Sequence, residues 1–81
     1  MSMPLPFIDV IETGNNILWL MTINGLSVKD LQGKFGFSTP QAIYKWINGK
    51  SLPTIDNLVS LAYIFNCKVD DIIIIAGKTR K

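Results

Sequence analysis

Apolar and polar positions along this 81-residue chain fall into helical blocks that glycine, proline or asparagine interrupts. Residues 13–23 form the first block, with Thr13 placed to cap a helix and Asn24-Gly25 placed to end it. The core stripe at helical spacing consists of Ile17, Leu20 and Met21. Leu18 and Trp19 fall outside that stripe, so they belong either to a broader core face or to an exposed apolar patch.

The segment before this helix has a different pattern. Residues 3–12 contain two prolines and, at strand spacing, set Phe7, Asp9 and Ile11 on one side against Ile8, Val10 and Glu12 on the other, which favours a short strand or an ordered arm over residues 1–12. The β-branched run Ile72–Ile75 near the other end is too apolar to be exposed. We therefore expect the end of that run either to continue a last helix or to leave it and pair with residues 7–11.

A second, short helix is predicted from Ser27 to about Phe35. Ser27 can cap it, Asp30 stands at the reciprocal position of a capping box, and Gly36 breaks it. After a turn at Phe37-Ser38, Thr39 is the expected cap of a third helix that begins at Pro40, where the missing N–H of proline costs nothing. This third helix continues to Asn48 and ends at Gly49.

Two further helices are predicted in the last third of the chain. Thr54 caps the fourth, Asn66 ends it, and its apolar residues cover more than half of its circumference, so we expect it to be the central core element. These apolar residues are Ile55, Leu58, Val59, Leu61, Ala62, Ile64 and Phe65. A short fifth helix starts near Val69, with Asp70 and Asp71 in its first turn. The predicted fold class is all-α, with five helices and a possible terminal β pairing.

Composition supports one folded domain. Hydrophobic residues make up 48% of the chain and charged residues 17%, and no apolar run reaches the ~18 residues of a membrane span. The first residues do not resemble a secretory signal, so we expect a cytoplasmic protein. We divide the chain into an arm (1–12), a helical domain (13–76) and a basic tail (77–81).

Residue types exclude several kinds of chemistry. Cys67 is the only cysteine and histidine is absent, which removes intrachain disulfides, ordinary zinc sites and imidazole catalysis. We therefore expect no enzyme, no metal and no cofactor, and we interpret Cys67 as a small buried hydrophobe. Large aromatic side chains are expected to pack in the core rather than to form a ligand or stacking surface: Phe35, Phe37, Trp46, Tyr63 and Phe65.

Charge is uneven although the net charge is only +2. The middle of the chain holds four lysines against one acidic residue, Asp30: Lys29, Lys34, Lys45 and Lys50. A second cluster ends the chain, with Lys78, Arg80 and Lys81. This second cluster is interpreted as a solubilising tail, with a phosphate-contacting arm as the alternative.

The second and third helices with their tight turn have the form that a reader of the DNA major groove requires. The groove is ~12 Å wide and admits one helix. On the third helix, three apolar positions share one face: Ile43, Trp46 and Ile47. Polar positions at spacings of three and four share another face: Gln41, Tyr44, Lys45 and Asn48. One face is expected to pack and the other to read DNA.

The segment LSVKDLQGKFGFSTPQAIYKWINGKSLPTIDNLVSLAYIFNCKVDDII resembles the XRE family, the Cro and phage-repressor type of helix-turn-helix regulator, and the resemblance covers residues 13 to about 75. Its markers in chain order are Gly-Leu-Ser, Ile-x-x-Trp, Asn-Gly-Lys, Leu-Pro, Asn-Leu-x-x-Leu-Ala and Asp-Asp-Ile. The resemblance implies a lambda-repressor-like domain that binds operator DNA as a repressor, usually as a dimer on a palindromic site.

Three positions depart from the family pattern. Val28 stands where the family usually has a glutamine that contacts a phosphate. Ile47 stands where an acidic residue is common, so no interior ion pair is expected. Gly33, rather than Gln32, could be the small residue at which the two helices cross.

The resemblance also implies roles for single residues. Base-reading positions are Thr39, Gln41, Ala42 and Lys45, and phosphate-contacting positions are Ser38, Tyr44, Asn48 and Lys50. Some of these have structural alternatives: Ser38 and Thr39 could serve the turn and cap, and Tyr44 could pack on the core. Gln41 and Lys45 could be ordinary solvated residues, and Asn48 could serve only to end the helix.

Leu18 and Trp19 raise the question of a partner. If exposed, they could form a homodimer interface, which a DNA-binding domain of this size usually requires. The competing function is a protein-interaction module, such as an antitoxin or adaptor, that uses the same patch to bind another protein.

Overall fold

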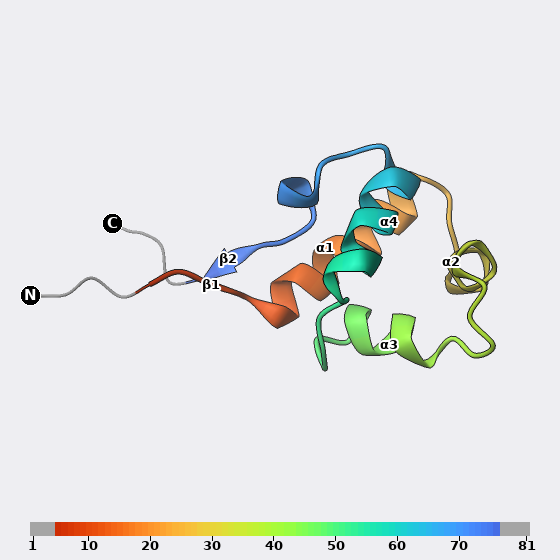
Figure 1. The fold of residues 1–81 in the computed structure, drawn as a ribbon, viewed down its shortest axis with the longest axis horizontal. Helices are drawn as coiled ribbons and strands as arrows, with labels where there is room; N and C mark the ends of the chain where they lie inside the picture. The colour runs from red at the N-terminus through yellow and green to blue at the C-terminus, as the bar shows by residue number, and fades with distance from the viewer. Residues whose placement is uncertain (1–4, 77–81) are drawn as a thin grey trace, which may run out of the picture.

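The computed structural model describes residues 5–76 and shows four α-helices, one 3-10 turn and a two-stranded sheet. In chain order these are β1 (Phe7–Ile8), α1 (Val10–Ile23), α2 (Val28–Phe35), α3 (Gln41–Ile47), α4 (Ile55–Phe65), η1 (Val69–Asp71) and β2 (Ile75–Ala76). Figure 1 shows α1 and α4 crossing at the centre, α2 and α3 to one side of them, and the strands projecting on the other side.

Helix α1 begins four residues earlier than the sequence predicted. Asp9 caps it, because its side chain accepts a hydrogen bond from the Glu12 N–H at 2.9 Å. Thr13, the expected cap, is instead fully buried, and its hydroxyl accepts the Ile74 N–H at 2.9 Å. The division expected between residues 12 and 13 therefore falls inside α1. A threonine that looks like a local cap serves a contact with the far end of the described chain.

Helix α2 confirms the predicted capping box. The Ser27 hydroxyl accepts the Asp30 N–H at 3.0 Å, while the Asp30 carboxylate accepts the Ser27 N–H at 2.9 Å. Gly36 ends the helix with φ of 71°, a left-handed conformation that glycine adopts without a steric penalty. Both ends of α2 thus follow from residues within or next to the helix.

Helix α4 also has the predicted ends, with Thr54 as its cap and Asn66 in the left-handed conformation after it. The expected fifth helix is not present in that form. Val69–Asp71 forms a single 3-10 turn, in which the Asp71 carboxylate accepts the Lys68 N–H at 3.0 Å. Ile72 is still in the helical region of φ and ψ, and the Ile73 N–H donates to the Val69 carbonyl at 3.2 Å. The chain then leaves the turn and reaches β2.

The sheet decides between the two outcomes expected for the end of the Ile72–Ile75 run in favour of the β pairing, in a shorter form. β1 and β2 are antiparallel, with Phe7 opposite Ala76 and Ile8 opposite Ile75. The Asp9 N–H donates to the Ile74 carbonyl at 2.8 Å, so the paired strands, the β1–β2 ribbon, lead directly into the cap of α1. Residues 9–11 of the expected pairing segment belong to the cap and first turn of the helix instead.

The core lies between the helices and contains side chains from every helix and from the turn after η1. Its buried members are Ile17, Leu20, Met21, Leu31, Ile43, Trp46, Leu58, Leu61, Ala62, Phe65 and Ile72. Ile55 and Val59 were expected in this core but are exposed, because α4 is buried along one side only. Among the described helices, none is both long enough and apolar enough to span a membrane.

Candidate nucleic-acid interface

Helix α3 separates its residues into a packed face and an open face. Ile43 and Trp46 are buried, and Ile47 is half-buried against the core. Gln41, Lys45 and Asn48 are exposed, at spacings of four and three that place them along one side of the helix. In Figure 1 α3 lies along one edge of the molecule, with no other labelled element outside it. This open side is available to a large partner such as a nucleic-acid duplex.

The start of α3 differs by one residue from the prediction. Pro40 is the cap residue, with φ of −86° and ψ of 6°, and its carbonyl accepts the Tyr44 N–H at 3.1 Å. No side chain caps this helix, so Thr39 does not serve as its N-cap. Because Pro40 already lies near the α region, the chain enters the helix without the extended cap residue that Thr39 would have provided. Thr39 and Ser38 are both exposed next to the open face.

The end of α3 is built from the backbone. Asn48 donates its backbone N–H to the Tyr44 carbonyl at 2.9 Å, and Gly49 follows in the left-handed conformation with φ of 71°. The backbone N–H groups of Lys50 and Ser51 then both donate to the Lys45 carbonyl, at 2.9 and 3.3 Å. Asn48 does end the helix, but its side chain and that of Lys50 remain exposed.

Aromatic side chains hold α3 against the end of α2. Phe35 and Phe37 stack with ring centroids 4.9 Å apart, and Trp46 meets both edge-on, at 5.6 and 6.1 Å. Trp46 is 3% exposed. This cluster confirms that these three aromatic residues pack together, and it fixes the angle between the two helices of the helix-turn-helix.

Gly14 on α1 provides a second support for α3, and the sequence did not indicate it. A Cβ atom built at Gly14 would overlap the Trp46 carbonyl oxygen and would lie 3.2 Å from both the Gly49 nitrogen and the Ile47 carbonyl carbon. The absence of a side chain therefore lets α1 touch the last turn of α3. The prediction for Gly33 was wrong, since nothing lies within 4 Å of a Cβ built there. Gln32 is half-buried instead, and its amide donates to the Phe37 carbonyl at 3.2 Å.

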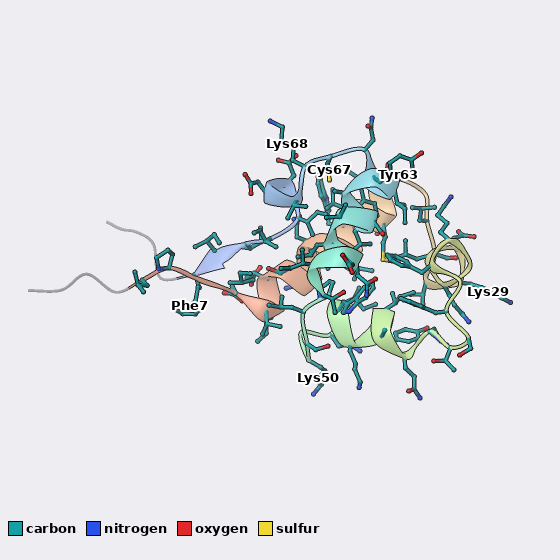
Figure 2. All side chains as sticks on the ribbon, in the orientation of Figure 1. Phe7, Lys29, Lys50, Tyr63, Cys67 and Lys68 are labelled. Atoms are coloured by element: carbon teal, nitrogen blue, oxygen red, sulfur yellow. The ribbon has the colours of Figure 1, made fainter. Side chains whose placement is uncertain are left out.

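The remaining predicted interface residues surround the open face. Tyr44 is 47% exposed and so does not pack fully into the core, while Ala42 is half-buried beside it. Lys45 and Lys50 are exposed, and Figure 2 shows Lys50 at the same edge of the molecule as α3. In the same view Lys29, on α2, points away from the body at another edge. The basic cluster Lys78, Arg80 and Lys81 lies outside the described residues.

The surroundings of two titratable groups, Asp30 and Cys67, shift their pKa values. Hydrogen bonds from Ser27, the backbone N–H foremost, lower the pKa of Asp30, as does the nearby charge of Lys34 to a smaller extent. Burial raises the pKa of the Cys67 thiol, with a further contribution from Asp71. Cys67 is thus a half-buried thiol that stays protonated, not a thiolate. Within residues 5–76, no three side chains of the metal-binding types gather to hold a metal ion.

Two apolar surfaces remain on the outside. Leu18 and Trp19 are 44% and 58% exposed, which decides between the two interpretations of these residues in favour of an exposed patch. Tyr63 was expected to pack in the core and is 87% exposed, because it lies on the outer side of α4. Figure 2 shows Tyr63 at the edge of the molecule opposite Lys50.

Comparison with known proteins matches this arrangement to a family. A model described as helix-turn-helix matches residues 17–72, which contain all four helices apart from the first turns of α1. The chain belongs to the XRE helix-turn-helix family. Membership of this family supports a DNA-binding regulator rather than an enzyme.

A solved structure described as the DNA-binding domain of BldD has the same fold as this helix-turn-helix protein. The two match with a TM-score of 0.69 and 19% sequence identity, over 82% of this chain and 94% of that one. At this identity the match shows the fold alone. No curated protein matches the sequence.

Proposed function

We propose that this XRE-family protein is a sequence-specific double-stranded DNA-binding protein that regulates transcription, as a repressor, in the cytoplasm. The observation that carries the proposal is the division of α3 into a buried face and an open polar face. A helix held on one side by Ile43 and Trp46 can enter the major groove without losing its packing.

Four residues, Thr39 before α3 and Gln41, Ala42 and Lys45 on it, read bases in this proposal. Gln41 offers an amide that can pair bidentately with adenine, and Lys45 offers an ammonium that can donate to guanine O6 and N7. Ala42 and the methyl group of Thr39 contact thymine methyl groups. Support for Thr39 comes from its free position at the helix start, since it caps no backbone N–H there.

Four further residues fix the register of the protein on the duplex through phosphate contacts: Ser38, Tyr44, Asn48 and Lys50. All four are exposed, and they lie before, along and after α3. Val28, which replaces the usual glutamine at the start of α2, is half-buried against the core and supplies no polar contact. Phosphate binding therefore depends on α3 and the turns beside it, and we expect affinity to fall steeply with salt.

A homodimer completes the proposal. Leu18 and Trp19 supply its apolar contact, together with Ile11 and Ile23, which are also exposed on α1. Two copies related by two-fold symmetry would present two α3 helices to the two halves of a palindromic site. A single domain of this size makes few base contacts, so the second copy raises the affinity to a useful level.

The test is base discrimination by variants of the open face. Gln41→Ala and Lys45→Ala should each reduce the preference for the selected site over a changed base by about 5–150-fold, which corresponds to roughly 1–3 kcal/mol. Neither should change the thermal unfolding curve, because both side chains are exposed. The site is first selected from random duplexes. Lys68→Ala is the control, since Lys68 carries the same charge at the opposite edge from Lys50 in Figure 2. Wild-type discrimination by either α3 variant would refute the assignment of α3.

The exposed α1 patch supports a second candidate function, a protein-interaction module such as an antitoxin or adaptor. Sedimentation and DNA titration separate the two. A protein that remains monomeric at micromolar concentration and has no affinity for any selected duplex would favour the protein-interaction module.

A further inference from the structure

Helix α4 carries an exposed apolar stripe that neither the core nor the proposed DNA interface uses. Ile55, Val59 and Tyr63 are 79%, 57% and 87% exposed. Their spacing of four residues places them in one row on the outer side of the helix, because side chains at i, i+4 and i+8 share a face. An apolar row of this kind indicates a contact with another molecule.

A groove lies beside one end of the stripe. It has a volume of about 580 Å³ and runs between α2 and α4, lined by Lys34, Phe35, Val59, Ser60, Tyr63 and Ile64. Apolar side chains from both helices form its walls, and Lys34 is its charged member. The other end of the stripe has the opposite features, because Ile55 protrudes there and Asp56 lies next to it in the first turn of α4.

The two ends of this surface are therefore complementary to each other. One end is hollow and carries a positive charge, and the other protrudes and carries a negative charge. A two-fold axis through Val59 sets two α4 helices antiparallel and places residue 56 of one copy level with residues 62 and 63 of the other. Asp56 and the groove-lining Ser60 lie on the same flank of the stripe, since they are four residues apart. Asp56 of each copy thus approaches Lys34 of its partner.

We propose that the Ile55–Val59–Tyr63 stripe and the α2–α4 groove form a self-complementary surface that binds a second copy of this chain. Ile55 and Tyr63 of opposite copies face each other, and an Asp56–Lys34 ion pair closes each end. This contact is separate from the α1 patch, so a dimer formed through Leu18 and Trp19 can associate further through α4.

The size of the surface sets the expected strength. The three stripe side chains expose roughly 450 Å², about half of the ~800 Å² that each partner of a standard interface buries. The groove walls add to this area, but the contact is small, and we expect association only at tens of micromolar. Proteins bound side by side on one DNA molecule reach such local concentrations, so the contact favours cooperative occupation of neighbouring sites.

The experiment separates this contact from the α1 patch by weakening that patch with Leu18→Ser and Trp19→Ser in all samples. In sedimentation equilibrium without DNA, the double variant should still pair reversibly, and adding Val59→Glu should leave a monomer. Lys34→Glu or Asp56→Lys should each weaken pairing about tenfold, because each places like charges together at both ends of the interface. Lys29→Glu changes the net charge equally outside the groove and should leave pairing unchanged.

Mixing the two charge variants gives the decisive result. In a mixed dimer, one end places the Lys34→Glu site of one copy next to the Asp56→Lys site of the other. The opposite end places the native Asp56 of the first copy next to the native Lys34 of the second. An ion pair therefore forms again at each end. An equimolar mixture should pair as tightly as the starting double variant, in a one-to-one complex. Pairing no tighter than that of each variant alone, or a starting variant that stays monomeric at several hundred micromolar, would overturn the proposal. Circular dichroism checks that every variant is folded. Because no DNA is present, an absence of pairing would contradict this proposal and not the proposed DNA binding.

Discussion

Gly14 offers a direct test of how α3 is held in place. In Gly14→Ala, the new Cβ overlaps the Trp46 carbonyl oxygen and lies 3.2 Å from the Gly49 nitrogen and the Ile47 carbonyl carbon. These atoms are backbone, so the overlap can be relieved only if α1 and the end of α3 move apart. Overpacking of this kind costs about 1–3 kcal/mol.

Part of that cost is offset, because alanine favours a helix over glycine by roughly 0.5–1 kcal/mol. We expect Gly14→Ala to lower the free energy of unfolding by about 1–2 kcal/mol. For a domain of this size each kcal/mol shifts the melting temperature by ~4–8 °C. Because the displaced atoms belong to the last turn of α3, affinity for the selected DNA site should fall as well.

Gly33→Ala is the matched control. Gly33 also lies inside a helix, but nothing stands within 4 Å of a Cβ built there. This variant should therefore gain the helix propensity without a clash and melt a few degrees higher than the wild type. Thermal unfolding followed by circular dichroism measures both variants under the same conditions. If Gly14→Ala were stabilised as much as Gly33→Ala, the close contact between α1 and α3 would be refuted.

Two other variants test contacts that join distant parts of the chain or cap a helix. Asn16→Ala removes the amide that donates to the Asp71 and Ile72 carbonyls at 2.8 and 2.9 Å, and should lower the free energy of unfolding by about 1–2 kcal/mol, measured by chemical denaturation. Asn15→Ala changes the exposed neighbouring residue and should lower it little. Asp30→Asn should flatten the pH dependence of the free energy of unfolding. The lowered pKa of Asp30 stabilises the fold above the ordinary aspartate pKa, near pH 4. This contribution is lost as the pH falls through the lowered pKa of the folded state, and the variant has no carboxyl group to lose it. Parallel curves for wild type and Asp30→Asn between about pH 5 and pH 3 would contradict the role of the capping box.

Local signals predicted much of this fold correctly. Ser27, Gly36, Thr54 and Asn66 end or begin helices as expected, because caps and left-handed residues act through neighbours in the chain. The open face of α3 also followed from spacing alone, since Ile43 and Trp46 at i and i+3 fix the buried side. Neither result needed knowledge of distant contacts.

The main errors arise because local signals do not show what distant segments of the chain contact or leave uncovered. Thr13 has the chemistry of a cap, yet its hydroxyl binds the N–H of Ile74, 61 positions away. In the sequence, Gly14 is a residue of low helix propensity with no visible role, and its close contact with the end of α3 appears only in the structure. Ile55, Val59 and Tyr63 fit a core pattern, but the other helices cover one side of α4 only. Apolar periodicity identifies a face, and tertiary packing decides whether that face is covered.

The β1–β2 ribbon has a consequence for how the protein folds and opens. Pairing Phe7 with Ala76 closes nearly the whole described chain into one loop, and loop closure of this length costs about 3–4 kcal/mol. Strands of two residues each cannot supply that energy, since even longer isolated hairpins are marginal in water. The buried Thr13 hydroxyl and the Asn16 amide must therefore hold the returning segment first. We expect the β1–β2 ribbon to form last during folding and to exchange its amide hydrogens first. The two strands can then separate while α3 keeps its place.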